Sequence, residues 1–292
     1  MKNAIIYYYD IFIDEYKKKN DKIIFIDKKN NYEYEFIEYY DDPNKLLNLY
    51  SLLRQNNILR YELILNKNNE IITNYDKKIY VLLKKNNLSS KRNLNFTELL
   101  NKNYIYGIKQ KNNWKELWKQ KNDYYEKYLD EIKFTMKAIK ESFSYYYALS
   151  ELAINILNYV NYNNINYTIC HKRIEKIDDL YHPLNVVIDN PTRDIAEFIK
   201  NQYINDKLTI EEILNFLNNN IYTKDESILL FARLVYPSYY FDMYEKICFY
   251  SEKEENIKKI IKKSVHYETL LKSIYKILKN RYNFIIIDFF EN

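Results

Sequence analysis

Side chains that could do chemistry gather in one non-helical stretch of the sequence, residues 167–191. It contains two of the three histidines, one of the two cysteines and several aspartates, namely Cys170, His171, Asp178, Asp179, His182 and Asp189. Imidazoles and carboxylates are the groups that proteins use to move protons, and carboxylates also bind Mg²⁺. If the chain has an active site, we expect it in this stretch.

The cysteines and histidines do not have the spacing of a zinc site. They are Cys170, His171, His182, Cys248 and His266, and the intervals between them match no pattern that holds Zn²⁺. Two widely separated cysteines also give no disulfide framework and suit a reducing compartment. We therefore expect no resident metal and a cytoplasmic location.

Glycine is almost absent, since Gly107 is the only one, whereas there are 34 tyrosines. Phosphate-binding loops and dinucleotide-binding turns need several glycines, because the backbone must adopt positive φ and approach the phosphate closely. The common routes to nucleotide binding are therefore closed, although a nucleotide could bind by other means. A genome rich in A and T would explain the tyrosines, but surface tyrosines also suit protein contacts.

The composition is that of a globular protein, with 47% hydrophobic and 29% charged residues. No run approaches the roughly 18 apolar residues of a membrane span, and the N-terminus lacks the features of a signal peptide. The net charge is +5, but the basic residues are scattered among 40 acidic ones. Nucleic-acid binding needs clustered cations, so we expect neither a membrane span nor a nucleic-acid partner.

The elements that would have to position this stretch fall into two parts. In the first part the apolar patterns predict helices at residues 4–18 and 44–56 and strands at 23–26, 32–40, 61–65, 71–72 and 79–83. We place an N-terminal lobe of sheet and helix at residues 1–86 and a linker or hinge region at 87–110. This order of elements describes a small sheet that carries a helix.

The second part, residues 111–292, is predicted to be mainly helical. Thr209 with Glu212 and Thr223 with Glu226 have the form of capping boxes and mark two helix starts. A last long helix is predicted at about 253–280, followed by an apolar tail at 284–290 that we expect to dock as a strand or to contact a partner. The whole chain is therefore predicted to be α+β.

Five separated segments occur in the order that one known family has. They are residues 114–118, 141–147, 169–171 with the strand ending in Asp189, 193–199 and 232–241. These segments resemble the aminoglycoside-phosphotransferase-like kinases, and within them the spore-coat-associated proteins of the CotS and YutH type. The resemblance implies a protein-kinase-like, two-lobed fold, in which the first hundred residues match only by element order.

The resemblance also implies where a catalytic loop would lie. In these kinases the loop reads His-x-Asp, with an asparagine about five residues further on and a metal-binding aspartate after the next strand. Here the loop would begin at His171, and Arg173 would replace the proton-accepting aspartate; arginine stays protonated and cannot act as a base. The asparagine position falls near Asp178, and only Asp189 keeps the spacing of the metal ligand.

The N-terminal part lacks its catalytic pair as well. Residues 32–40 would be the strand that offers the nucleotide-binding lysine, and they contain none; residues 44–56 contain no glutamate to hold one. Lys84 or Lys85 could be recruited from a later strand, in an unusual geometry. Three catalytic elements are thus missing independently.

Other interpretations of these residues remain open. Residues 179–185 imitate an intact loop of the form Asp-Leu-His-Pro-x-Asn, but Asn185 lies only four residues before Asp189, which leaves no room for the usual hairpin. We expect His171 to be a buried, hydrogen-bonded turn residue. We expect Asp194 to accept hydrogen bonds from the backbone of the loop or to cap the helix that follows.

We therefore expect a catalytically inactive, kinase-like protein, a pseudokinase, that contacts other spore coat proteins in coat assembly or sporulation. Its expected location is the mother-cell cytoplasm and the spore coat, and it would need no cofactor. The alternative is an unorthodox phosphotransferase that uses ATP and Mg²⁺ on a coat protein or a small hydroxyl substrate. In that case Asp178 or Asp179 would be the base and Asp189 would hold the metal.

Overall fold

The computed structural model describes residues 1–19, 22–27, 32–56, 60–85, 94–100, 113–129, 136–250 and 252–291. The chain packs into two compact units. The first unit contains residues 1–94 and 176–187, and the second contains residues 95–175 and 188–292. Residues 176–187, which the sequence placed in the C-terminal lobe, thus pack with the N-terminal residues. Gly107 and most of the expected linker lie outside the described residues.

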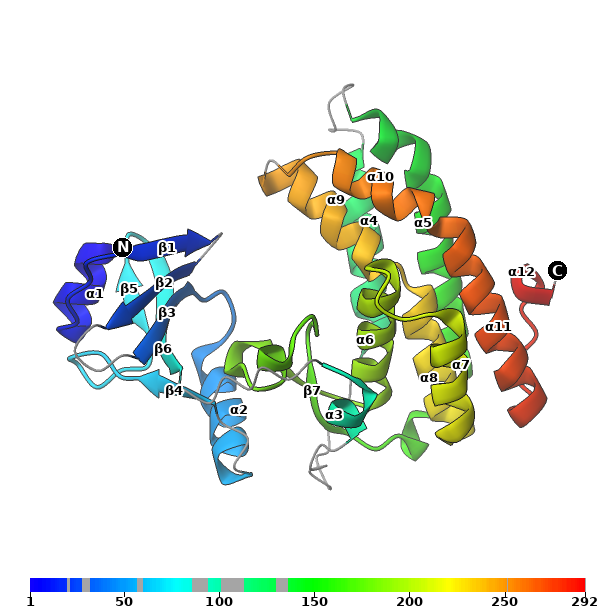
Figure 1. The fold of residues 1–292 in the computed structure, drawn as a ribbon, viewed down its shortest axis with the longest axis horizontal. Coiled ribbons are helices and arrows are strands. Elements are labelled where there is room, and N and C mark those ends of the chain that lie inside the picture. Colours follow the sequence, from blue (N-terminus) through cyan, green and yellow to red (C-terminus); the bar gives the residue numbers. More distant parts are fainter. Residues whose placement is uncertain are drawn as a thin grey trace. The chain divides into compact units, whose positions relative to one another are not determined.

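The first unit is built on an antiparallel sheet (Figure 1). Its strands are β1 (Tyr16–Lys19), β2 (Lys22–Asp27), β3 (Tyr32–Glu38), β4 (Tyr61–Ile64), β5 (Thr73–Tyr75) and β6 (Lys78–Lys85). They are ordered β1-β2-β3-β6-β4, and β5 pairs with β6. The strands predicted at 23–26, 32–40, 61–65 and 79–83 are confirmed, and the one predicted at 71–72 begins two residues later.

Two helices supply the apolar cover of this sheet. Helix α1 (Lys2–Tyr9) buries Ile5 against a cluster that includes Phe25 and Phe36. Helix α2 (Pro43–Gln55) buries Leu46 in a separate cluster with Val81. Because side chains alternate between the faces of a strand, the sheet can be apolar on both sides and hold one helix on each.

The helix predicted at residues 4–18 is wrong in its second half. Helix α1 ends at Tyr9, where Asp10 adopts a left-handed conformation with φ of 55°, and β1 begins at Tyr16. Ile13 is still buried, in the same cluster as Ile5. Its apolar character therefore reflects packing of the connecting segment rather than another helical turn.

The second unit is mainly helical (Figure 1). Its helices are α3 (Phe96–Leu100), α4 (Trp114–Leu129), α5 (Lys137–Ile156), α6 (Thr192–Ile204), α7 (Ile210–Asn219), α8 (Lys224–Val235), α9 (Ser238–Tyr250), α10 (Glu255–Lys262), α11 (Ser264–Tyr282) and α12 (Asp288–Glu291). Helix α8 is central, since it packs against α5, α6 and α11. A helix surrounded in this way must be apolar nearly all round, and every residue of α8 from Ser227 to Val235 is buried.

The C-terminal elements differ from the prediction in two ways. The single helix expected at 253–280 is two helices, α10 and α11, that meet at Lys263. Lys263 donates to the backbone oxygen of Ile204 and pairs with Asp206, so its side chain ties the junction to the end of α6. The apolar tail docks against α11 as the short helix α12 with Phe290 buried, and not as a strand.

Both capping boxes are confirmed. The hydroxyl of Thr209 accepts a hydrogen bond from the Glu212 backbone at 3.2 Å, and the Glu212 carboxylate accepts one from the Thr209 backbone at 2.8 Å. Thr223 and Glu226 make the same pair of bonds. Each box satisfies backbone donors that the first turn of a helix leaves without partners.

Replacing Thr209 with alanine should therefore lower the free energy of unfolding by about 1 kcal/mol, because one backbone donor of α7 loses its acceptor. Urea denaturation followed by circular dichroism measures the change. Thr209→Ser is the matched control, since it keeps the hydroxyl, and it should stay within a few tenths of a kcal/mol of the parent protein. Equal losses in both variants would show that the threonine methyl group, and not the cap, matters.

Candidate functional site

The candidate loop begins on a short two-stranded sheet. Strand β7 (Thr168–His171) pairs with β8 (Val186–Asp189), and the connection between them holds two short 3₁₀ helices, Ile177–Leu180 and Pro183–Asn185. All four residues of β7 are buried. Strand β7 packs against α6, so the start of the loop lies close to the first turn of α6.

His171 and Asp194 form the first contact of this kind. The His171 backbone N–H donates to Asp194 Oδ1 at 2.8 Å, and His171 Nδ1 lies 2.8 Å from Asp194 Oδ2. His171 is 2% exposed and Asp194 3% exposed. His171 is the last residue of a strand rather than part of a turn. Asp194 lies in the first turn of α6, whose N-cap is Pro191, so it accepts from the loop backbone and does not cap its own helix.

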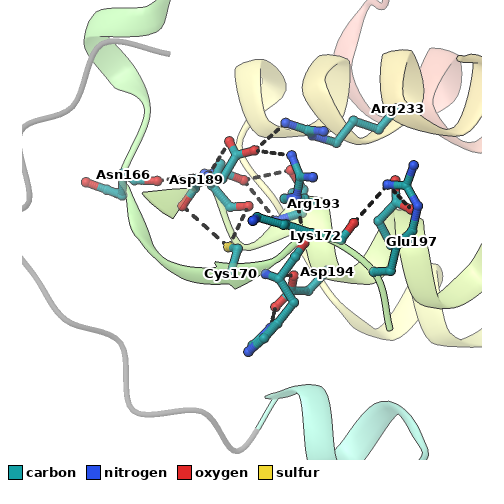
Figure 2. Close-up of polar contacts among 12 residues, drawn as sticks. Asn166, Cys170, Lys172, Asp189, Arg193, Asp194, Glu197 and Arg233 are labelled. Atoms are coloured by element: carbon teal, nitrogen blue, oxygen red, sulfur yellow. Dashed lines mark hydrogen bonds and ion pairs between the residues drawn. The ribbon is translucent and has the colours of Figure 1, made fainter. Parts of the chain in front are cut away.

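Asp189, which has the spacing of the metal ligand in the related kinases, is held between two arginines (Figure 2). Its Oδ2 accepts a hydrogen bond from Arg193 Nη1 at 3.1 Å and another from Arg233 Nη2. Its Oδ1 accepts one from the Asn190 backbone at 2.8 Å, and the residue is 2% exposed. A Mg²⁺ ion at this carboxylate would lie beside two guanidinium groups, which repel it.

The two arginines are fixed by further contacts. Arg193 Nε donates to the backbone oxygen of His171 at 2.7 Å. Both guanidinium groups stack on the Trp114 ring, with 4.5 Å from each Cζ to the ring centroid. Arginine commonly stacks on aromatic faces in this way. Asp189 is thus the centre of a buried cluster that joins β8, α6, α8 and α4.

Arg173, which stands at the position of the catalytic base, makes a bidentate ion pair with Asp242. Its Nε and Nη2 lie 2.6 Å from Oδ2 and Oδ1 of Asp242 on α9, and its Nη1 lies 3.5 Å from Glu197. Burial opposes the charge, but Glu197 and Asp242 outweigh it and raise the pKa of Arg173 above its usual value. The side chain therefore stays a cation and cannot accept the proton of a substrate hydroxyl.

Glu197 continues this network further along α6. It pairs with Lys200 at 2.8 Å, and Lys200 also donates to the Ser238 hydroxyl at 2.7 Å. Burial alone would raise the pKa of Glu197, but Lys200 and Arg173 lower it to about 2. At neutral pH Glu197 is a carboxylate that cations already neutralise, which makes it a weak base.

The aspartates proposed as alternative bases lie in the first unit. Asp178 pairs with Lys85 on β6 at 2.7 Å, and Asp179 accepts a hydrogen bond from the Lys176 backbone at 3.0 Å. Lys84 pairs with Glu62 at 3.1 Å. Both lysines that could have replaced the missing nucleotide-binding lysine therefore have acidic partners.

A further buried carboxylate, that of Glu35 on β3, was not expected from the sequence. It lies in the strand that lacks a lysine, and it pairs with Lys22 on β2 at 2.7 Å and with His182 Nε2 at 3.3 Å. The His182 ring packs against the Tyr61 ring with centroids 4.8 Å apart. Burial opposes ionisation of Glu35, but the hydrogen bond and charge of His182, together with Lys22, lower its pKa to about 2.

This lowered pKa predicts a specific loss of stability in acid. The pKa of the carboxyl is about 2 in the folded state and 4.5 ordinarily. Its contribution to the free energy of unfolding is therefore complete above pH 4.5 and disappears as the pH falls toward 2. The contribution is roughly 3 kcal/mol at neutral pH. Glu35→Gln should therefore be clearly less stable than the parent at pH 7, and the difference should shrink between pH 4.5 and pH 2.

Urea denaturation of both proteins across this range measures the difference. Glu62→Gln is the control, because it removes a half-exposed carboxylate from β4 and should change stability little. A difference between Glu35→Gln and the parent that did not depend on pH would contradict the assignment.

Among the residues that the structure describes, no group of three or more histidines, cysteines, aspartates or glutamates could hold a metal ion. In the same part of the chain, no helix has both the length and the apolar character needed to cross a lipid bilayer.

An antiparallel N-terminal sheet with helices, followed by a larger helical part that contains a two-stranded loop between α5 and α6, defines a protein-kinase-like fold. Solved structures of phosphotransferases have the same fold. An aminoglycoside phosphotransferase from Alicyclobacillus acidocaldarius superposes with a TM-score of 0.60 over 96% of both chains, at 11% identity. A spectinomycin phosphotransferase, solved with ADP and spectinomycin, superposes with a TM-score of 0.58 over 94% of this chain and 96% of its own, at 11% identity. At these identities the likeness establishes the fold alone.

The family follows from residues 2–274, which match the family described as "Spore coat putative kinase YutH". The chain belongs to this family. It is also 27% identical over 226 residues to the endospore coat-associated protein YutH of Bacillus subtilis strain 168, and the match spans 66% of each chain, just under two thirds. The resemblance to the YutH type and the kinase-like fold expected from the sequence are therefore confirmed.

Proposed function

We propose that this YutH-family chain is a pseudokinase that acts in the spore coat by binding other coat proteins, without transferring a phosphoryl group. The observation that carries the proposal is the state of Asp189. Its carboxylate is buried, and both of its oxygens already accept hydrogen bonds, two of them from guanidinium groups. Phosphoryl transfer needs this aspartate to hold a metal ion that neutralises the phosphates.

The other charged positions support the same conclusion. Arg173 is a cation where the reaction needs a base, and Asp242 holds it in place. The strand that should offer a lysine offers Glu35 instead, paired with Lys22. A kinase active site keeps such charges available for the nucleotide, metal and substrate. Here each of these charges has an intramolecular partner.

The competing function is an unorthodox phosphotransferase, which the family description and the phosphotransferase structures favour. It would need Asp178 or Asp179 as base and Asp189 as metal ligand, with ATP and Mg²⁺ as cofactors. The ion pair of Asp178 with Lys85 and the two arginines on Asp189 both oppose it.

Genetic complementation separates the two functions. In the source organism, a strain that carries Asp178→Asn with Asp179→Asn should assemble a spore coat like that of the parent, whereas a deletion strain should not. Purified protein should transfer no label from ATP to coat extract. Label transfer that disappears in the double variant, together with a defective coat, would establish the phosphotransferase instead.

A further inference from the structure

The second unit contains two adjoining hollows. The outer cavity has a volume of about 600 Å³, and the smaller one, here called the recess, has a volume of about 70 Å³. They adjoin because Arg173, Glu197, Lys200, Ser238 and Asp242 line both. Arg173 thus lies at the passage between them. Asp189 lines neither hollow, so the side chains of Arg173 and Asp189 do not converge on one cleft.

Most of the charged side chains that line the recess are cations. Five cations line it, namely Lys121, Arg173, Arg193, Lys200 and Arg233. Three carboxylates pair with this set, namely Asp189, Glu197 and Asp242. Of these five cations, Arg193, Lys200 and Arg233 are buried, whereas Lys121 and Arg173 are partly exposed. A buried cation favours an anionic partner, because a charge in a medium of low polarity is costly.

Two hydrogen-bond donors around the recess also lack acceptors. Within the described part of the chain, the Tyr236 hydroxyl and the Trp114 indole N–H are buried without a hydrogen-bond partner, and both residues line the recess. Tyr236 is 4% exposed, and its ring stacks on Trp118 with centroids 4.2 Å apart, which fixes the direction of the hydroxyl. An indole N–H can only donate, so a partner for it must be an acceptor.

Burial has the largest influence on the pKa of two buried cations of the lining, Lys200 and Arg233, whereas Glu197 and Asp242 raise the pKa of Arg173. Burial lowers the pKa of Lys200 even though Glu197 is its partner, and burial likewise lowers the pKa of Arg233 despite Asp189. An additional anion among these groups would favour their charged forms.

We infer that the recess binds a tetrahedral oxyanion, phosphate or sulfate, either as the free ion or as the end group of a phosphorylated small molecule that lies in the outer cavity. Guanidinium groups and fixed N–H and O–H donors are the groups that recognise such anions. The recess offers roughly the space of two to three water molecules in the liquid, which is enough for one such group and not for a nucleotide. The outer cavity is in the size range of small-molecule sites.

This binding goes beyond the proposed function, because it requires neither Mg²⁺ nor transfer. It also gives Arg173 a role that suits a cation. An arginine at the position of a catalytic base cannot accept a proton, but it places a positive charge at the passage into the recess.

The test is a titration of the whole chain with inorganic phosphate in the absence of Mg²⁺. Binding is measured by calorimetry and by thermal unfolding, and sodium chloride at matched ionic strength is the control. We expect saturable binding and a rise in Tm with phosphate. Tyr236→Phe should weaken phosphate binding about tenfold, because it removes one hydrogen bond to a charged ligand. Without phosphate this variant should be as stable as the parent, because its hydroxyl has no partner to lose.

Tyr146→Phe is the matched control. Its hydroxyl is also buried and without a hydrogen-bond partner among the described residues, but Tyr146 does not line the recess. It should keep the full response to phosphate. Glycerol 3-phosphate and glycerol distinguish the two sources of the anion: tighter binding of the ester than of phosphate identifies the end group of a larger ligand, and the reverse identifies the free ion. Absence of saturable phosphate binding, or equal responses in the two variants, would overturn the inference.

Discussion

Replacing Arg233 with methionine should destabilise the second unit by about 3–5 kcal/mol, the range found when one partner of a buried ion pair is removed. Arg233 donates to Asp189 and stacks on Trp114, and both charged side chains are almost fully buried. Methionine keeps much of the side-chain volume, so the loss would come mainly from the carboxylate of Asp189, which would keep Arg193 but lose its second guanidinium partner. Urea denaturation followed by fluorescence and circular dichroism measures it.

Two further variants test the cause of this loss. Adding Asp189→Asn to Arg233→Met should recover part of the stability, because the added change removes the carboxylate that has lost its Arg233 partner. Lys258→Met is the control, since it breaks an ion pair with Glu255 on the surface of α10 and should leave the midpoint unchanged. Strictly additive losses in the double variant would show that Asp189 and Arg233 do not act as a pair.

Replacing Asp194 with alanine should have the second largest effect, a loss of about 3–5 kcal/mol. One carboxylate holds both the backbone N–H and the ring of His171, and all of these groups are buried. Hydrogen bonds to a charged acceptor contribute about 1.5–3 kcal/mol each, and their removal leaves buried donors without partners. Thermal and urea unfolding measure the loss.

Asp194→Asn is the informative comparison. Asparagine keeps one acceptor oxygen for the His171 backbone but offers an N–H₂ group in place of the second oxygen, so its loss should be smaller than that of alanine. His171→Phe, which keeps the backbone N–H and removes only the ring contact, should also be intermediate. If Asp194→Ala unfolded at the same urea concentration as the parent, Asp194 would not hold the loop.

The features that were predicted well from the sequence are those that residues close together in the sequence determine. A capping box is complete within four residues, and both boxes at Thr209 and Thr223 are present. Periodicity was less reliable where apolar residues serve another purpose. Ile13 packs from a connecting segment, and the apolar pattern runs without interruption across Lys263, where α10 gives way to α11.

The charge partners in the candidate site could not be predicted, because they are distant in sequence. Arg173 and Asp242 are separated by 69 residues, and Asp189 and Arg233 by 44. The sequence showed Arg173 at the position of a base and Asp189 as a possible metal ligand. It contained no signal that Arg233 would neutralise Asp189. Glu35 was missed because an acidic residue in an otherwise alternating strand is normally exposed.

The direct test of a pseudokinase is whether ATP with Mg²⁺ stabilises the protein. A ligand at about one hundred times its Kd stabilises the folded state by about 2.7 kcal/mol, which raises Tm by roughly 5–10 °C for a unit of this size. Thermal unfolding should be measured with ATP at millimolar concentration, with Mg²⁺ or with EDTA, and against inorganic phosphate. We predict no rise in Tm that depends on Mg²⁺. A Mg²⁺-dependent rise of several degrees that Asp189→Asn abolishes would contradict the loss of catalysis.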